Sequence, residues 1–239
     1  MAFKQFNLDG IGPLTVYKRR GSRTMRLSVT SDGKIRVTIP SYAPYQTGLA
    51  FAHSKRTWLQ AQSSQRSYSL ENGQEIGKHH RLILSVNFQA EKPTTRVTNT
   101  EVRVSYPAGI DASDQVVQSA AIKASTKALR NEAEAQLPSR LAAIAERHEF
   151  SYKSVSIKQL KGRWGSCDQD KRIVLNLYLM QLPWELIDYV LLHELIHTRH
   201  LNHGPDFWDS FLKHEPKAKQ LRKQIRRYQP NFNVMQALK

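Results

Sequence analysis

The sequence predicts an α+β protein in which a β-rich amino-terminal part precedes a smaller, mixed carboxy-terminal domain. Short runs of alternating apolar and polar residues dominate residues 1–110. From residue 111 onward the apolar spacing becomes mainly helical, with two short strand-like runs between the helices. One strongly apolar helix among them carries two histidines and a glutamate. We therefore divide the chain into residues 1–110 and residues 111–239.

The amino-terminal part opens with a predicted β-hairpin. Alternating apolar residues occur over 25–29 and again over 35–39, and Ser31-Asp32-Gly33 between them is typical of a turn. Residues 47–62, after Pro44, have helical spacing. Further strands are expected at 81–88 and 101–107, with an exposed polar loop at 91–100, and no internal repeat is visible. The predicted buried side of the helix consists of Leu49, Phe51, Ala52, Trp58 and Leu59.

The second part begins with a long helix over residues 113–147, which is rich in Ala, Gln and Glu and which Asp111 or Ser113 is expected to cap. Pro138 should kink or split it, because proline lacks a backbone donor and crowds the preceding turn. Strand-like runs follow at 152–160 and 172–180, on either side of the loop 161–171.

Three helices are expected after residue 180. The first starts near Pro183, and Gly204-Pro205 marks its end and the start of the next. Pro216 can open the last helix. The middle helix has an apolar side made of Phe207, Trp208, Phe211 and Leu212, and the last has a basic side made of Lys219, Arg222, Lys223, Arg226 and Arg227.

Composition restricts the class of protein. An apolar fraction of 40% with 23% charged residues is typical of a globular chain. No run approaches the roughly 18 apolar residues of a membrane span, and the first residues lack the pattern of a secretory signal. The single cysteine, Cys167, excludes an internal disulfide framework and a Cys-rich zinc site. We expect a cytoplasmic protein without membrane contact.

The net charge of +16 is unevenly distributed. Residues 1–107 carry 16 basic and 6 acidic residues, and residues 211–239 carry 8 and 1. Such an excess favours polyanions such as nucleic acid, through neutralisation of phosphates and release of counterions. The alternative is that a basic surface only keeps the protein in solution.

The segment His193-Glu194-Leu195-Ile196-His197 is the most informative motif. Histidines four residues apart on a helix project from one face, so both imidazoles can reach a single metal ion. Glu194 points in a neighbouring direction, close to the open coordination position. In so apolar a helix these polar side chains would be costly to bury without a partner. The motif predicts one zinc ion.

Catalytic zinc usually has three protein ligands and a water. His203 is the preferred third ligand, because HTRHLNHGP can turn the chain back toward the metal just after the helix. His200, one turn from His197, and Glu215, further downstream, are the alternatives.

The predicted chemistry is hydrolysis of a peptide bond in a protein or peptide. Zinc lowers the pKa of a bound water toward ~7, and Glu194 would take the proton and deliver it to the leaving amine. Tyr189, Arg163 and His200 are candidates to stabilise the oxyanion. Two other classes are a nucleic-acid-binding protein with a structural zinc and a catalytically silent scaffold. Structural sites prefer four ligands and need no base, so Glu194 favours the hydrolase.

Three segments resemble the YgjP-like family of metallopeptidases: RWGSC at 163–167, LNLYLMQLP at 175–183 and YVLLHELIHTRHLNHGPDFW at 189–208. That family is similar to the SprT-like and WLM proteases, which share the zincin core. The resemblance implies a small zincin-like carboxy-terminal domain, zinc binding by His193, His197 and His203, and catalysis by Glu194. The SprT-like and WLM relatives also suggest a protease recruited to DNA-bound protein.

Substrate contacts are expected from the two segments before the motif. Residues 173–180 either form an edge strand that pairs with an extended peptide or an ordinary core strand. Arg163, Trp164 and Asn176 are candidate substrate-binding residues. In the alternative interpretation, Trp164 and Cys167 only pack beneath their loop.

Overall fold

The structure is a computed structural model that describes residues 2–8, 12–29, 35–59 and 69–232. Contacts divide the chain into two compact units, Met1–Tyr68 and Ser69–Lys239. Both mix strands with helices, so the predicted α+β class is confirmed. None of the helices in the described ranges combines the length and hydropathy needed to cross a membrane.

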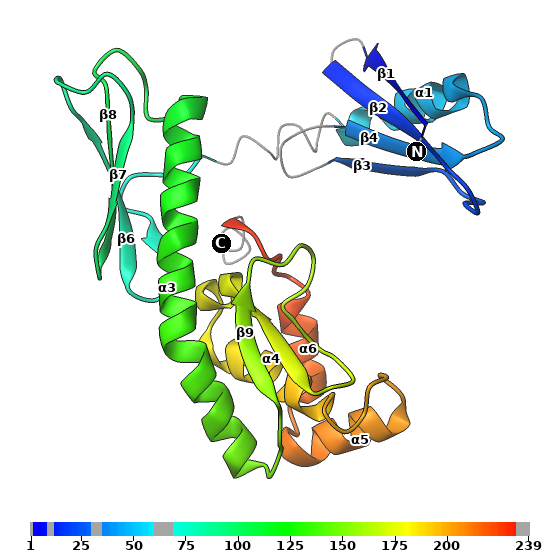
Figure 1. The fold of residues 1–239 in the computed structure, drawn as a ribbon, viewed down its shortest axis with the longest axis vertical. Coiled ribbons are helices and arrows are strands. Elements are labelled where there is room, and N and C mark those ends of the chain that lie inside the picture. Colours follow the sequence, from blue (N-terminus) through cyan, green and yellow to red (C-terminus); the bar gives the residue numbers. More distant parts are fainter. Residues whose placement is uncertain (1, 9–11, 30–34, 60–68, 233–239) are drawn as a thin grey trace. The chain divides into compact units, whose positions relative to one another are not determined.

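The first unit is a four-stranded sheet with a helix on one face (Figure 1). Its order is β1-β2-β4-β3, and the apolar residues of β2 and β4 pack with those of α1 in one core. The predicted hairpin is confirmed as the antiparallel pair β3 and β4, while its expected turn at 31–33 lies outside the described residues. Trp58, expected to be buried, is 44% exposed. The elements are β1 (Phe3–Leu8), β2 (Gly12–Arg19), β3 (Arg26–Val29), β4 (Ile35–Pro40) and α1 (Tyr45–Ser54).

The second unit starts with another four-stranded sheet, which packs on a long helix (Figure 1). The order of this sheet is β5-β6-β8-β7. The strands predicted at 81–88 and 101–107 are confirmed as β6 and β8, but the expected loop at 91–100 contains β7. The elements are β5 (Glu75–Ile76), β6 (His80–Val86), β7 (Thr94–Val97), β8 (Glu101–Tyr106) and α3 (Gln115–Arg147).

The two sheets repeat one topology, which the sequence analysis missed. In each sheet the first and second strands are antiparallel, the second and fourth parallel, and the third and fourth antiparallel. A helix follows the fourth strand in both. The register also agrees, because Leu14 faces Ile35 in one sheet and Leu82 faces Val102 in the other. Only the short match between IRVTIP at 35–40 and VRVSYP at 102–107 marks the repeat in the sequence.

Helix α3 joins the second sheet to the rest of its unit. One part of it packs on β7 and β8, and another on the elements that follow it in the chain. The helix is continuous across Pro138 and bends in its carboxy-terminal third (Figure 1). Asp114, not the expected Asp111 or Ser113, caps it by accepting from the Val116 amide at 2.8 Å. Since the second sheet is held by α3, the division at residues 68/69 differs from the predicted boundary at 110/111.

The remainder of the second unit consists of a small sheet and three helices. The sheet order is β10-β11-β9, so β11 lies in the centre and β10 at an edge. Of the two interpretations of residues 173–180, the edge strand is therefore wrong, and the core strand is confirmed for residues 173–176, which belong to the central strand. Residues 177–181 turn into a 3-10 helix after Asn176. The elements are β9 (Ser154–Lys158), β10 (Gly165–Cys167), β11 (Arg172–Asn176), η1 (Leu177–Gln181), α4 (Trp184–Ile196), α5 (Pro205–His214) and α6 (Ala218–Ile225).

Candidate metal centre

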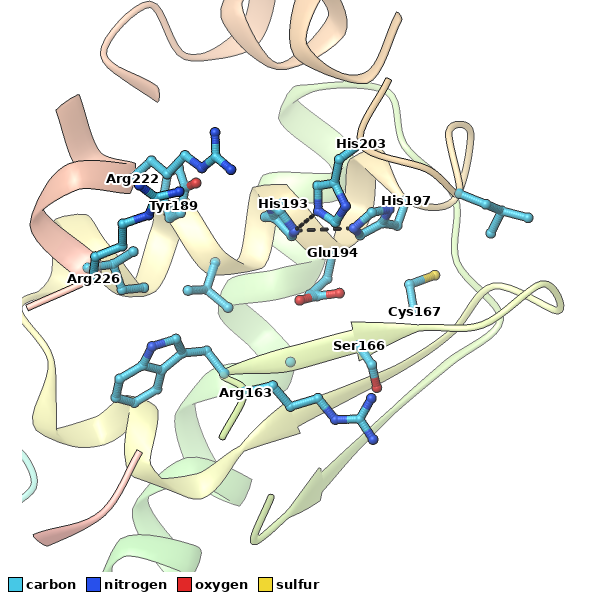
Figure 2. A pocket seen from close by; sticks show the side chains of 15 residues that line it. Arg163, Ser166, Cys167, Tyr189, His193, Glu194, His197, His203, Arg222 and Arg226 are labelled. Carbon is cyan, nitrogen blue, oxygen red and sulfur yellow. Dashed lines mark hydrogen bonds between the residues drawn. The ribbon is translucent and has the colours of Figure 1, made fainter. Parts of the chain in front are cut away.

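Three histidines converge beside helix α4 (Figure 2). The Nε2 atom of His193 lies 3.1 Å from Nε2 of His197 and 3.0 Å from Nε2 of His203. One nitrogen from each ring lies within 4.8 Å of the others. Among the described residues, these three form the cluster of His, Cys, Asp and Glu side chains that has metal-ligand spacing.

Local structure and packing hold the three rings. His193 and His197 are one helical turn apart at the end of α4, so they share a face. His203 directly precedes Gly204, which caps α5. Phe207, fully buried in α5, packs against all three imidazoles at centroid distances of 4.7–5.0 Å. Phe207 is thus a positioning residue, whereas the sequence predicts it only as part of the apolar side of its helix.

The two alternative ligands serve other purposes. The His200 carbonyl oxygen accepts a hydrogen bond from Nδ1 of His197 at 2.9 Å, which leaves the His197 Nε2 lone pair directed at the cluster. The Glu215 carboxylate accepts from the Lys217 amide at 2.9 Å, at the turn before α6. Neither side chain belongs to the cluster, whereas His203 does.

Glu194 lies next to the histidines and is 4% exposed. Its Oε2 atom is buried and has no hydrogen-bond partner among the described residues. Burial raises the pKa of this carboxyl to about 8, and the Arg163 guanidinium partly opposes that rise. A buried carboxylate without a partner is costly, which points to an absent cation or polar ligand.

The site has room for Glu194 only because residue 165 is a glycine. A Cβ atom on Gly165 would lie 2.7 Å from Glu194 Oε1 and 2.9 Å from its Cδ and Cγ atoms. Strand β10 therefore approaches the carboxylate as closely as a backbone without a side chain allows. Gly165 and Ser166 are the first two residues of this strand.

The histidine cluster fits a divalent metal such as zinc. Burial, followed by the charges of His197, His203 and Arg222, lowers the pKa of His193 to about 3, so its imidazole is neutral at pH 7. Neutral imidazole is the form that binds metal. Three histidine ligands with a carboxylate nearby are typical of a catalytic zinc site, which keeps its fourth position open.

A cavity of about 510 Å³ opens onto the cluster. Arg163 and Trp164, two of the candidate substrate-binding residues, line it together with strand β10. Asn176 does not. Its fully buried amide donates to the carbonyls of Leu160 at 2.9 Å and Arg163 at 2.8 Å and accepts from the Tyr178 amide at 3.2 Å. The expected substrate contact of Asn176 is therefore replaced by a structural one that shapes the loop before β10.

The opposite wall of the cavity is basic. Arg222 and Arg226, one turn apart on the carboxy-terminal helical segment, line it with Tyr189 (Figure 2). Burial raises the pKa of the Tyr189 phenol to about 12, so it retains its proton at neutral pH. Both arginines belong to the predicted basic side of this helix, but their spacing alone does not indicate that they line the same cavity as the histidines.

Comparison with known proteins identifies the family. The sequence profile described as "YgjP-like, metallopeptidase domain" matches residues 23–228.

The chain belongs to the YgjP-like metallopeptidase family.

Membership makes this YgjP-like chain a metal-dependent peptide hydrolase, as the motif predicts. Two solved structures are similar to parts of it: the metallopeptidase zymogens abylysin of Pyrococcus abyssi and jannalysin of Methanocaldococcus jannaschii. Both are 24% identical, cover 38% of this chain, and have TM-scores of 0.35 and 0.34. The match spans 91% of abylysin and 93% of jannalysin. No curated protein matches the chain.

Proposed function

We propose that the chain is a zinc peptidase in which His193, His197 and His203 hold one zinc ion and Glu194 is the general base. The convergence of three imidazole nitrogens beside a buried carboxylate without a partner carries this proposal. Bound zinc would supply a Lewis acid that polarises the scissile carbonyl and acidifies a water molecule.

Glu194 has the properties of a proton carrier. Its buried carboxylate takes a proton from water in the cavity and delivers it to the leaving nitrogen of the peptide. Burial raises the pKa of this carboxyl in the metal-free protein, and the charge of a bound zinc ion would lower it, so that the carboxylate could accept the proton. Gly165 allows the carboxylate to stay at the cluster.

Strand β10 is the element best placed to bind an extended peptide. It pairs with β11 on one side, is the edge of its three-stranded sheet, and contributes all three of its residues to the cavity wall. An edge strand offers free main-chain donors and acceptors, and a substrate strand can pair with them. We therefore assign to β10 the pairing with a substrate peptide that the sequence suggests for residues 173–180.

Two residues remain candidates to stabilise the oxyanion. Tyr189 lines the cavity with a protonated phenol, and Arg163 lines it with a permanent charge. The side chain of His200, the third candidate, is absent from the cavity wall. We assign the oxyanion contact to Tyr189 or Arg163, because a donor must reach the reacting carbonyl directly.

The charge of the cavity favours acidic substrates. Arg163, Arg222 and Arg226 line it, and Glu194 is the acidic residue among its described lining. Arg226→Glu should shift cleavage from peptides with acidic residues toward peptides with basic ones. Arg227→Glu is the matched control, because this neighbouring exposed arginine lies outside the cavity wall. An equal shift in both variants would attribute the effect to net charge alone.

The central test compares the zinc-loaded wild type with Glu194→Gln on an unstructured protein substrate. Loss of a general base should reduce kcat by about 10²–10⁴, while the zinc content stays at one ion per chain. Equal cleavage by both proteins would remove Glu194 from its proposed role.

The alternative of a structural zinc in a nucleic-acid-binding protein has less support. Structural sites use four protein ligands, whereas the described cluster has three and keeps an acid beside them. Recruitment to DNA-bound protein would draw on the basic residues of the last helix. Two of its arginines, Arg222 and Arg226, line the cavity instead. Adding DNA to the cleavage assay tests recruitment, since a recruited protease would cleave a DNA-bound substrate faster.

A further inference from the structure

The first sheet has an open face with an unusual composition. One face of β2 and β4 is apolar and packs with α1. Side chains alternate along a strand, so the other face carries Phe3, Tyr17 and Arg36, each on a different strand. Phe3 lies opposite Tyr17 in the register, with ring centroids 5.6 Å apart. The Arg36 guanidinium lies 4.2 Å from the centre of the Tyr17 ring.

These side chains are available to a ligand. Phe3 is 58% exposed, which is unusual for a large apolar side chain, and Arg36, on the other side of strand β2, is exposed as well. Arg19 and Arg26 extend the same face. Arg19 lies two residues after Tyr17 on β2, and Arg26 lies two residues before the β3 residue that is opposite Arg36 in the register. The face therefore combines an aromatic pair with three guanidinium groups.

The first unit has a large excess of basic over acidic residues. Residues 1–68 contain 11 basic residues and two acidic ones, Asp9 and Asp32, which both lie outside the described residues. No described residue of this unit is acidic, so the unit itself offers no described carboxylate to the three arginines. A surface of this kind is complementary to a polyanion.

The second sheet provides an internal comparison. Arg103 occupies the position of Arg36 in the repeat, but it pairs with the Glu101 carboxylate at 2.8 Å. Ser85 occupies the position of Tyr17, and its hydroxyl lies 3.2 Å from that of Ser105. The second sheet thus pairs Arg103 with a carboxylate and has a serine where the first sheet has Tyr17, although Arg96 lies opposite Arg103 in its register. The combination of an aromatic pair with arginines that have no described carboxylate beside them belongs to the first sheet and is not a general property of the fold.

We propose that the open face of β1, β2, β3 and β4 binds single-stranded nucleic acid. Bases stack on Phe3 and Tyr17, while Arg19, Arg26 and Arg36 contact the phosphates. Aromatic side chains on a sheet within a basic surface are the means by which proteins bind unpaired bases with little sequence preference. A duplex hides its base faces and an acidic peptide has none, so both should bind this face less well.

The test measures binding by full-length protein in fluorescence anisotropy with a labelled 15-nucleotide oligothymidylate. At 50 mM NaCl the single strand should bind more tightly than a duplex of the same length and a poly-glutamate peptide. Phe3→Ala should weaken single-strand binding by at least about fivefold, the lower end of the effect of losing one stacked base. Arg36→Gln should lower the slope of log K against log salt by about 0.7, the value for one phosphate contact on a single strand.

Matched controls separate this face from general charge and hydrophobicity. Arg103→Gln removes the same charge at the equivalent position of the second sheet, and Phe88→Ala removes a phenylalanine that is 87% exposed in the second unit. Neither should change binding by more than twofold. Melting curves of all variants should match the wild type, because Phe3 and Arg36 lie outside the core.

Three results would overturn the proposal. The first is no binding of the single strand at 50 mM NaCl. The second is wild-type affinity of the Phe3→Ala/Arg36→Gln double variant, or equal losses in the control variants. The third is equal affinity for single strand, duplex and poly-glutamate, which would indicate a surface selective only for negative charge.

Discussion

Replacing Gly165 by alanine should disable the site while leaving the fold intact. The added Cβ would lie 2.7 Å from Glu194 Oε1 and 2.9 Å from its Cδ atom. Ordinary contacts begin near 3.4 Å, so the carboxylate must move by roughly 0.5–1 Å, as such overpacking requires. Glu194 is the group that yields, because its Oε2 atom has no described partner to hold it and strand β10 is paired to β11.

The magnitude differs between activity and stability. A misplacement of roughly 1 Å at a reacting group costs about 10²-fold in rate, and loss of the general base costs at most about 10⁴-fold. We therefore expect kcat/KM to fall by about 10²–10³. Overpacking costs roughly 1–3 kcal/mol, while the lower entropy of the unfolded alanine chain offsets about 0.4–1 kcal/mol. The melting temperature should fall by less than about 10 °C.

The assay measures kcat/KM on an unstructured protein substrate, zinc content and the melting temperature. Gly109→Ala is the matched control, because a Cβ there meets nothing within 4 Å. Wild-type kcat/KM in Gly165→Ala would refute the reasoning, since it would mean that the position of Glu194 does not limit the reaction. Loss of zinc from the variant would place the damage at the histidines instead.

Three further predictions concern the surroundings of the site. Asn176→Ala should lower the free energy of unfolding by about 2–3 kcal/mol, because it leaves buried backbone groups unpaired; a raised KM at unchanged stability in urea titrations would instead restore its substrate role. His203→Ala should lose zinc, measured by mass spectrometry of the metal, whereas His200→Ala should retain it, because only the His200 carbonyl is used; the reverse pattern would contradict the ligand set. Burial, followed by the charges of Glu194 and Asp168, raises the pKa of the Cys167 thiol to about 11. At pH 8 the thiolate fraction of Cys167 in the metal-free protein is therefore about one hundredth of that of an ordinary cysteine. Alkylation by iodoacetamide should accordingly be slow at pH 8 and accelerate up to about pH 11, and rapid alkylation at pH 7 would contradict this.

Much of the fold could be predicted because it depends on local pattern. The hairpin of β3 and β4 follows from period-2 alternation, and the strands β6 and β8 from the same signal. Strand β7 was missed because its residues, Thr94–Val97, are mostly polar and exposed, so it lacks the apolar alternation. The repeat of the two sheets was missed for a related reason. The two sheets share their strand order and register, and both can be kept while almost every residue changes. Only IRVTIP and VRVSYP remain similar in sequence.

The errors at the site share one cause, which is that contacts between separate elements are not encoded locally. Residues 173–176 read as a strand, but nothing within them distinguishes a central strand from an edge. The role of Asn176 depends on the loop at Leu160 and Arg163, 13–16 residues earlier in the chain. Arg222 and Arg226 similarly became part of the cavity wall because α6 packs on α4.

The sequence by itself determined that His193, Glu194 and His197 share one region of a buried helix. Helical geometry sets that arrangement within a single turn, so four residues of spacing suffice to specify it. Only the tertiary structure decided that His203, rather than His200 or Glu215, completes the cluster, and that Gly165 brings a strand edge against the carboxylate. These contacts join separate elements, and the packing of Phe207 and β10 on α4 sets their distances.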